Sequence, residues 1–255
     1  MIKTTAYKIF ACLVLTALSS GASYAETKPG TPGKKAVLVE LFTSEGCSSC
    51  PPADRVLIAM QAQPLEGIEI ITLSEHVSYW NYLGWSDPFS QETFSERQRQ
   101  YASKIKGSSV YTPQMVINGK TQLVGSNYLK ALAEIKQAAL TAKDKISFDV
   151  VEQSSDQLKL SGTAITEQKQ STCVAAIVED GLVSQVKSGE NSGARLPHNS
   201  VVREWLELGS LTAQKPLHFD RNVALKKSWN LKNVRVVLFL QTPTGEVTTA
   251  ATKRY

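Results

Sequence analysis

Residues 39–54 read VELFTSEGCSSCPPAD, and this stretch decides the predicted fold. It overlaps a short apolar run of strand length at residues 36–42, and apolar residues recur at helical spacing from Ala53 onward. Cys47 and Cys50 therefore lie between a buried strand and the start of an amphipathic helix. Two intervening residues allow the sulfurs to close a disulfide of acceptable geometry.

A cysteine pair at a helix N-terminus is typical of redox chemistry. Unpaired N–H groups and the positive end of the helix dipole favour a thiolate, which lowers the thiol pKa. In most such pairs the first cysteine, here Cys47, is exposed and attacks a substrate disulfide, and the second, here Cys50, resolves the mixed disulfide. The alternatives are an inert stapling disulfide and half of a zinc site, although a zinc site would need a second cysteine pair.

The composition is that of a globular protein. The chain has 255 residues, of which 42% are hydrophobic and 20% charged, which argues against a disordered or polytopic membrane protein. The formal net charge is +5. Without Lys3 and Lys8, which lie in a segment we expect to be removed, 26 basic residues face 23 acidic ones, an excess of +3. No Lys/Arg cluster suggests a phosphate-binding surface, so nucleic acid is not an expected partner.

Residues 1–25 have the pattern of a signal peptide. A positively charged start precedes an apolar core at residues 9–18, which is too short to span a bilayer, and small residues occupy the positions that a signal peptidase reads. We expect cleavage after Ala25, no membrane anchor after cleavage, and a periplasmic or secreted protein. An uncleaved membrane anchor is the alternative.

The periodicity changes near residue 146 and predicts two domains. Residues 26–35 are rich in Pro, Gly and Lys and predict a flexible leader. Residues 36–143 alternate strand-like and helix-like segments in the order β-α-β-α-β-β-α, which predicts an α/β layer domain. Residues 146–255 carry short alternating strands separated by turn signals, which predict an antiparallel β-sandwich.

Two hairpins are predicted within these domains. Asn118-Gly119 is a strong two-residue turn signal after the strand at residues 115–117. Asp180-Gly181 is expected to join the apolar run at residues 173–178 to the strand that follows it. Cys173, the first residue of that run, is expected to be a buried core residue.

Residues 36–142 resemble the thioredoxin-like superfamily. The resemblance rests on the strand before Cys47, the motif Cys47–Cys50 with the helix after it, and the segment VYTPQM at residues 110–115. It implies a cis peptide bond before Pro113, which would face the dithiol. It also implies that the backbone of Thr112 would pair with a substrate chain.

The whole chain resembles a narrower family of secreted bacterial proteins. The matching segments are residues 39–54, 76–88 and 111–115. That family has a thioredoxin-like domain and a C-terminal β domain, and it has no settled biochemical function. The resemblance implies the fold class: an α/β thioredoxin-like domain followed by an antiparallel β-sandwich domain.

Two ionisable residues near the motif, Glu40 and His76, are candidates for proton chemistry, and a third, Glu45, would affect the Cys47 thiol. Glu40 resembles the buried acid that shuttles protons in thioredoxin, and a solvated or salt-bridged glutamate is the alternative. Glu45 is an adjacent carboxylate that would oppose thiolate formation at Cys47. His76 follows a predicted strand at the edge where this fold keeps its active site, and is a candidate proton donor or metal ligand. The alternative for His76 is a histidine that only makes a hydrogen bond.

A dense aromatic segment follows His76 on an apparent loop. It contains four candidate substrate-binding residues, Tyr79, Trp80, Tyr82 and Trp85. Such density suggests a recognition platform or a lid over the dithiol, or else a loop core that covers the end of the domain. Further along, His198 could contact a ligand or the first domain, together with Asn199 and Arg203.

Three functions remain open from the sequence. The first is an exported thiol–disulfide oxidoreductase, in which Thr112-Pro113 positions a peptide for Cys47. It needs no organic cofactor, because the electrons reside in the dithiol, and it implies protein thiols or disulfides as substrates and a redox partner protein. The second is a Cu(I)-handling protein with a soft site made by Cys47, Cys50 and His76. The third is a binding module in which the disulfide only staples the aromatic loop.

Overall fold

The computed structural model describes Met1 and residues 34–63, 65–140 and 144–254. Apart from Met1, the predicted signal peptide lies outside these residues, as does nearly all of the predicted leader. Gly33–Tyr255 form one compact unit, which contains every helix and strand discussed below. In the described part of the chain, none of the helices has the length and apolar character needed to cross a bilayer.

The first half of the unit alternates strands and helices, as the periodicity predicts. Its elements are β1 (Lys35–Thr43), α1 (Pro51–Ala62), β2 (Ile68–His76), α2 (Glu92–Lys104), β3 (Gln114–Ile117), β4 (Thr121–Val124) and α3 (Tyr128–Ala138). β1 and β2 are parallel, so their C-terminal ends lie side by side. β3 is antiparallel to β1 and forms a hairpin with β4. Asn118 and Gly119 both have positive φ at this hairpin, which confirms the predicted turn.

The second half of the unit consists of strands and one short 3-10 helix, Leu231–Asn233. Its strands are β5 (Lys145–Ser154), β6 (Gln157–Ile165), β7 (Ser171–Glu179), β8 (Leu182–Gln185), β9 (Arg195–His198), β10 (Val201–Leu211), β11 (Leu217–Ala224), β12 (Val234–Gln241) and β13 (Val247–Arg254). The predicted hairpin at Asp180-Gly181 is wrong, because β7 pairs with β10 and β12 whereas β8 pairs with β9.

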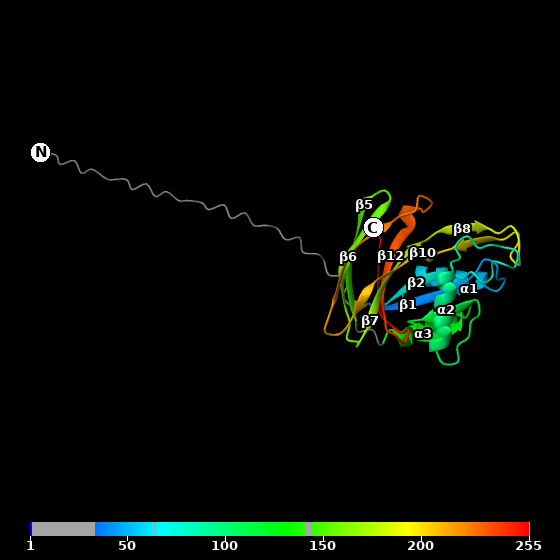
Figure 1. Ribbon diagram of the computed structural model, residues 1–255, viewed down its shortest axis with the longest axis horizontal. Coiled ribbons are helices and arrows are strands. Elements are labelled where there is room, and N and C mark those ends of the chain that lie inside the picture. The colour runs from blue at the N-terminus through cyan, green and yellow to red at the C-terminus, as the bar shows by residue number, and fades with distance from the viewer. Residues whose placement is uncertain (2–33, 64, 141–143, 255) are drawn as a thin grey trace. The chain divides into compact units, whose positions relative to one another are not determined.

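Strands from both halves share one mixed sheet of eight strands (Figure 1). Its order is β13-β12-β7-β10-β2-β1-β3-β4, and the two halves join where β10 runs parallel to β2, at Val201 opposite Ser74. Strands make up 47% of the structure and helices 18%. The predicted fold class, a thioredoxin-like α/β domain followed by an antiparallel β-sandwich domain, is therefore wrong. Local periodicity predicts individual strands, but it carries no information on which distant strands pair.

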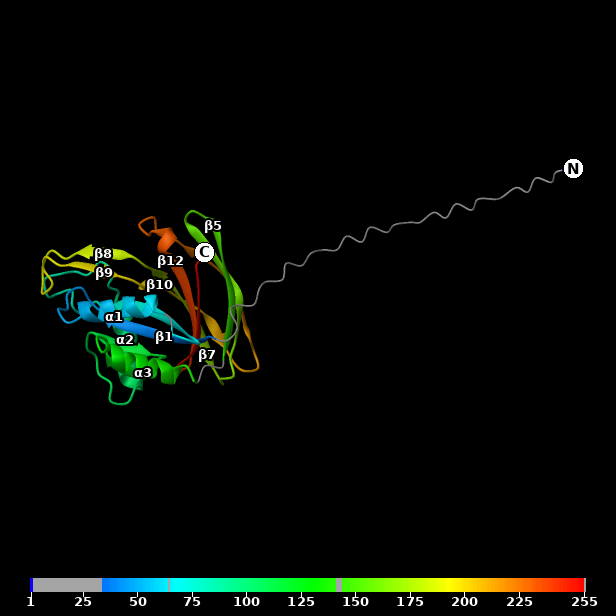
Figure 2. The ribbon, with the colours of Figure 1, turned by 180° about the vertical axis from the view of Figure 1, so that it is seen from behind.

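The helices cover both faces of the sheet at one end of the unit. Leu57 of α1 and Ile135 of α3 share a buried cluster with Val39 of β1, whereas Phe94 of α2 packs with Leu38 on the other face. Successive strand residues point to opposite faces, so neighbouring positions of β1 enter different cores. Figure 2 shows these helices together at one end, with β5 and β6 at the other.

A second sheet, of order β11-β6-β5, packs against the C-terminal half of the large sheet. Leu160 of β6 and Phe219 of β11 lie in one buried cluster with Ile177 of β7 and Leu238 of β12. Cys173 belongs to the same cluster, so its predicted place in the core is confirmed. Burial raises the pKa of the Cys173 thiol to about 12, which leaves it protonated at neutral pH.

Phe239 tests how strongly the two halves depend on one another. Its side chain is 0% exposed and clusters with Leu73 of β2 and Phe94 of α2. Phe239→Ala is expected to lower the free energy of unfolding by about 3–5 kcal/mol, because it empties a large volume between the halves. Urea unfolding checks this value. Val183→Ala, at a position 46% exposed, is the control and should change the same quantity by less than about 0.5 kcal/mol. Equal effects of the two substitutions would contradict the prediction.

Candidate functional site

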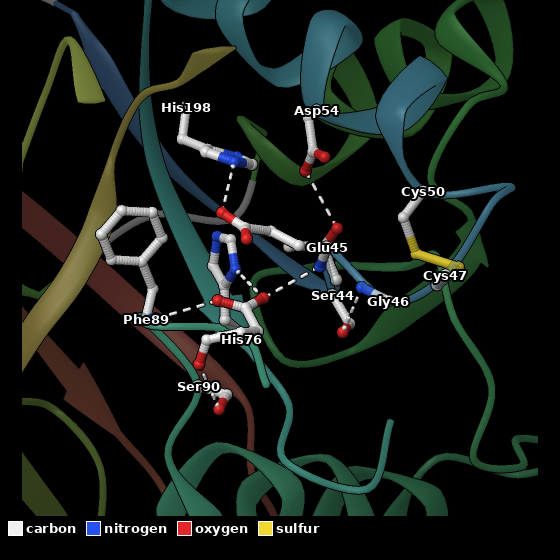
Figure 3. A network of polar contacts seen from close by, with 12 residues as sticks. Ser44, Glu45, Gly46, Cys47, Cys50, Asp54, His76, Phe89, Ser90 and His198 are labelled. Atoms are coloured by element: carbon white, nitrogen blue, oxygen red, sulfur yellow. Dashed lines mark hydrogen bonds and ion pairs between the residues drawn. A yellow bond between two sulfur atoms is a disulfide. The ribbon is translucent and has the colours of Figure 1, made fainter. Parts of the chain in front are cut away.

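Cys47 and Cys50 form a disulfide between the end of β1 and the start of α1 (Figure 3). Their Cα atoms are 5.4 Å apart. The Cys50 carbonyl accepts hydrogen bonds from the N–H groups of Ala53 and Asp54, so the disulfide turn continues directly into the helix. The predicted location of the pair is confirmed, but the expected exposure of Cys47 is wrong. Cys47 is 1% exposed and Cys50 is 0% exposed.

The loop of residues 187–194, here called the strap, connects β8 with β9 and contacts the disulfide turn. The N–H of Ser48 donates to Glu190 Oε2 at 2.9 Å, and Asn191 Nδ2 donates to the Cys47 carbonyl at 2.9 Å. The hydrogen bonds from Ser48 lower the pKa of the exposed Glu190 carboxyl. Polar contacts of this kind hold a loop in place with little buried apolar surface, so opening it costs little free energy.

Glu45 lies two residues before Cys47 and is buried. Its side chain extends away from the disulfide and toward the C-terminal half of the unit (Figure 3). Glu45 Oε2 accepts a hydrogen bond from Trp85 Nε1 at 2.8 Å, and Oε1 lies 3.1 Å from His198 Nε2. The Glu45 carbonyl accepts the second hydrogen bond of Asn191, at 2.8 Å. The disulfide turn is thus held by contacts from both halves of the unit.

A second histidine–carboxylate pair lies beside the first. His76 ends β2, and its Nδ1 lies 2.7 Å from Asp87 Oδ2. The same Asp87 oxygen accepts the N–H of Glu45 at 2.9 Å. The rings of His76 and His198 meet edge to face with centroids 5.0 Å apart, and Phe89 packs edge-on against both. The two pairs therefore form one buried polar cluster behind the disulfide turn.

The charges in this cluster shift several pKa values. Burial alone would lower the pKa of His76, but the carboxylates of Asp87 and Asp54 outweigh burial and raise it. Burial would raise the pKa of Asp87, but the neighbouring His76 holds it below its usual range. Burial raises the pKa of Asp54, against the charges of His198 and His76 and the hydrogen bond from Thr43 at 2.9 Å. The cluster thus favours a protonated imidazole at His76.

Two nitrogens of the cluster lack a hydrogen-bond partner among the described residues: Nε2 of His76 and Nδ1 of His198. In the same part of the chain, no group of three or more His, Cys, Asp or Glu side chains is arranged to hold a metal ion. The residues of the alternative Cu(I) site are engaged elsewhere. Cys47 and Cys50 are bonded to each other, and His76 is bonded to Asp87.

Trp80 connects the disulfide turn with the other predicted catalytic segment. Its Nε1 donates to Thr112 Oγ1 at 2.8 Å. A Cβ placed on Gly46 would lie 3.3 Å from the Trp80 Cβ, so the turn packs directly against this aromatic residue. The peptide bond between Thr112 and Pro113 is cis, which confirms the predicted isomer.

The other aromatic residues of the loop divide between the interior and the surface. Trp85 donates into the buried cluster, and the Tyr79 hydroxyl donates to Gln98 Oε1 at 3.0 Å. Tyr82 is 80% exposed, and its neighbour Leu83 is 44% exposed. Three of the four aromatics are thus anchored by hydrogen bonds, as in a loop core, and Tyr82 extends into solvent.

Glu40 belongs to a separate buried cluster on the face of β1 opposite to α1. Arg97 Nε donates to Glu40 Oε1 at 2.6 Å, and the Tyr101 hydroxyl donates to Oε2 at 2.6 Å. The guanidinium of Arg97 also lies 4.4 Å from the centroid of the Trp205 ring. Of the two interpretations of Glu40, the structure shows the salt-bridged glutamate.

Glu75 lies next to this ion pair and is 0% exposed. Its carboxylate oxygens have no hydrogen-bond partner among the residues the structure describes, and the Nε of Arg97 is 3.7 Å away. Burial, and then the charge of Glu40, raise the pKa of Glu75 well above its usual range, against the opposing effect of Arg97. Glu75 is therefore held as a neutral acid.

Several residues of the site carry no signal in the sequence. Glu190 and Asn191 lie in a loop without periodicity, and Asp87 has no motif that links it to His76. The predicted contact of His198 with the first half of the chain is confirmed by the 3.1 Å distance between its Nε2 and Glu45 Oε1. Only the density of Gly, Asn and Ser around residues 188–193 could have marked the strap as an irregular segment.

Residues 38–241 match a family model described as "Protein of unknown function (DUF1223)". The chain belongs to this family. It is similar in structure to protein AGR_C_4864 from Agrobacterium tumefaciens, with 26% identity, 87% of this chain and 95% of that chain covered, and a TM-score of 0.66. It is also similar to HBP35 of Porphyromonas gingivalis, with 14% identity, coverage of 87% and 76%, and a TM-score of 0.63. No curated protein matches the chain.

Membership of the DUF1223 family confirms the predicted resemblance at the level of a family without a settled function. The finer part of that resemblance is not supported, because none of these similarities assigns a thioredoxin-like domain to the chain. At 14% identity, the likeness to HBP35 concerns the fold alone.

The strap offers a test of access to the disulfide in this DUF1223 protein. Asn191→Ala removes the hydrogen bonds to the carbonyls of Glu45 and Cys47. Two such bonds contribute about 1–2 kcal/mol to keeping the strap closed. We expect dithiothreitol to reduce Cys47–Cys50 about 5–30-fold faster in the variant, as measured by alkylation and mass spectrometry.

Ser192→Ala is the matched control for the strap. The Ser192 hydroxyl donates within the strap, to the carbonyl of Lys187. This variant should therefore be reduced at the rate of the unmodified protein. Equal rates for Asn191→Ala and Ser192→Ala would show that the Asn191 contacts do not limit access to the disulfide.

The raised pKa of Glu75 makes the free energy of unfolding depend on pH. Between the ordinary pKa of 4.5 and the raised pKa of the folded state, the folded protein keeps this proton and the unfolded chain loses it. The free energy of unfolding therefore falls as pH rises, by up to about 1.4 kcal/mol per pH unit. Glu75→Gln imitates the neutral acid, so its urea unfolding should depend less on pH and should show higher stability at pH 7. Glu69→Gln, exposed on the same strand, is the control. Parallel pH curves for the two variants would contradict the assignment.

Proposed function

We propose that Cys47–Cys50 is a redox-active disulfide and that the protein is an exported thiol–disulfide oxidoreductase acting on protein substrates. The reaction uses no organic cofactor, because the two electrons are carried by the dithiol itself. It requires a redox partner protein that restores the starting state of the pair.

The short span of the disulfide carries this proposal. The two cysteines are three positions apart in sequence. Closing so small a loop removes little entropy from the unfolded chain, about 2 kcal/mol by the loop-entropy relation. The aromatic loop is anchored by Trp80 and Trp85, through hydrogen bonds to Thr112 and Glu45. A disulfide that joins residues 47 and 50 does not staple that loop, so redox chemistry accounts better for the pair.

The place of the pair at the start of α1 supports the assignment of roles. The positive end of the helix dipole stabilises a nearby negative charge. Pro51 and Pro52 have no N–H group, and the N–H groups of Ala53 and Asp54 donate to the Cys50 carbonyl, so the dipole provides this stabilisation. The thiolate of Cys47 attacks a substrate disulfide, forms a mixed disulfide and releases one substrate sulfur as a thiolate, which takes up a proton. Cys50 then loses its proton and attacks the sulfur of Cys47. This step re-forms the Cys47–Cys50 bond and releases the second substrate thiol.

In this reaction the dithiol loses two electrons and the substrate disulfide gains them. The reverse sequence oxidises a substrate dithiol with the same bonds made and broken. Both cysteines are buried and attack at either sulfur requires access, so we propose that the strap moves away from the disulfide turn during turnover. Thr112 and Pro113 are the residues that we propose to position the substrate chain.

The sequence of the first 25 residues supports export. A positively charged start, a short apolar core and small residues before the expected cleavage point are the features of a signal peptide. An oxidising compartment favours persistence of the Cys47–Cys50 disulfide and supplies substrates with disulfides.

The reduction potential of Cys47–Cys50 tests the proposal. We expect a reversible two-electron transition between about −270 and −120 mV in graded glutathione buffers, the range of working oxidoreductases. Cys47→Ser should abolish exchange with a disulfide-containing protein substrate. Cys50→Ser should instead accumulate a mixed disulfide with that substrate, because the resolving thiol is absent. Alkylation with mass readout measures both results.

Cys173→Ser is the control for these variants, since Cys173 is buried away from the pair and should leave exchange unchanged. A pair that stays oxidised below about −300 mV would identify a structural disulfide and overturn the proposal. Persistence of function in a folded Cys47→Ser variant would instead favour a binding module. Loss of Cu(I) affinity on His76→Gln, with exchange unaffected, would favour metal handling.

A further inference from the structure

We propose that His198 is a positioning residue for the dithiol. It carries a positive charge that neutralises the buried carboxylate of Glu45 and thereby permits a thiolate at Cys47. This inference rests on the proposed function and assigns a role in it to the C-terminal half of the chain.

The sequence of the disulfide turn places the carboxylate of Glu45 near the nucleophile, Cys47. Glu45 and Cys47 are two positions apart, so their Cα atoms are separated by no more than about 7 Å. The Glu45 carboxylate extends away from the disulfide, so it lies farther from the sulfur than the two Cα atoms lie from each other (Figure 3). At an effective dielectric constant of about 20, a buried charge about 10–12 Å away still lowers the fraction of thiolate about tenfold at a given pH. The turn therefore requires a positive charge next to Glu45 if Cys47 is to react at neutral pH.

His198 meets that requirement by its position. Among the residues that the structure describes, Trp85 and His198 are the side chains within hydrogen-bond distance of the Glu45 carboxylate. Trp85 donates a hydrogen bond but has no charge, whereas an imidazole can carry one. The side chains of His198 and Glu45 are 1% and 0% exposed, so their contact is shielded from solvent. A buried carboxylate without such a partner is strongly unfavourable.

Other carboxylates around the site add negative charge that a positive charge on His198 would offset. Asp54 faces the site from α1, Asp87 faces it from the aromatic loop, and Glu190 contacts the turn from the strap. His76 from β2 is committed to Asp87. With both histidines protonated, two positive charges face Glu45, Asp54 and Asp87. Loss of the charge on His198 leaves Glu45 uncompensated beside the nucleophile.

The test measures the thiolate of Cys47 directly. All variants carry Cys50→Ser, so that Cys47 remains a thiol, and buried Cys173 contributes only a slow background. The rate of alkylation by iodoacetamide is followed by mass spectrometry from pH 5 to pH 10. The midpoint of the rate profile reports formation of the thiolate, and the plateau at high pH reports access to the sulfur. These two quantities separate an electrostatic effect from movement of the strap.

His198→Gln keeps a hydrogen-bond donor for Glu45 but removes the charge. We expect its midpoint to move to higher pH, its rate at pH 7 to fall about tenfold, and its plateau to stay unchanged. Adding Glu45→Gln to His198→Gln should restore the rate at pH 7, because the uncompensated carboxylate is gone. Glu45→Gln alone should react at least as fast as the parent, which keeps the test valid if His198→Gln does not fold. His218→Gln, at an exposed position on β11, should leave the profile unchanged.

An unchanged midpoint in folded His198→Gln would overturn the inference, and so would a double variant as slow as His198→Gln. A Glu45→Gln variant slower than the parent would overturn it as well. The outcome is distinguishable from failure of the proposed function. A potential below about −300 mV would refute the oxidoreductase while the alkylation profiles still report the role of His198.

Discussion

The parallel pairing of β10 with β2 is the contact on which the rest of the structure depends. The N–H of Ser74 donates to the carbonyl of Ser200 at 2.7 Å, and the hydroxyls of Thr72 and Ser200 lie 2.6 Å apart. Arg235 reaches across the same junction to the Thr72 carbonyl at 3.0 Å. β9 ends just before this junction. The pairing therefore brings His198 and the strap close to the disulfide turn, although the strap and the turn are far apart in sequence.

Alternation along β1 separates two buried polar clusters. Glu40 points to the face covered by α2, where Arg97 and Tyr101 neutralise it. Beyond the end of β1, Glu45 points toward His198. Each cluster contains more than one carboxylate and its own cation, so charges that would repel one another are divided between separate sites. Because a buried charge must be paired where it lies, this separation lets one strand carry a structural ion pair and the support of the disulfide turn.

The sequence predicts the local elements well and their assembly poorly. The order of strands and helices up to residue 138 and the hairpin at Asn118-Gly119 follow from local signals that the structure confirms. The cis bond before Pro113 is implied by the family resemblance, and the structure confirms it as well. The predicted hairpin at Asp180-Gly181 does not form, and the reason is physical. The run CVAAIV at residues 173–178 is apolar on both faces, which is typical of a strand with neighbours on each side. This strand, β7, pairs with β10 on one side and with β12 on the other, and β8 pairs with β9 instead.

The same distinction applies to the candidate site. The cysteine pair is visible in the sequence because its spacing is local, whereas the hydrogen bonds that its turn makes with Asn191 and Glu190 come from a distant loop, whose approach no local pattern specifies. Glu45 could be named from the sequence as an obstacle to a thiolate, but the group that compensates it could not.

A disulfide that is inaccessible in the closed structure is not thereby inert. The strap contacts the disulfide turn through hydrogen bonds, which exchange for bonds to water at small net cost when the strap opens. In the buried histidine–carboxylate cluster behind the turn, His76 and His198 end strands and Asp54 lies on α1. Asp87 is held by its hydrogen bonds with His76 and with the N–H of Glu45, so these contacts do not involve the strap. The strap can therefore open while the contacts between the histidines and the carboxylates stay in place. Access to the dithiol can change in this way without a change in the charges that act on the Cys47 thiol.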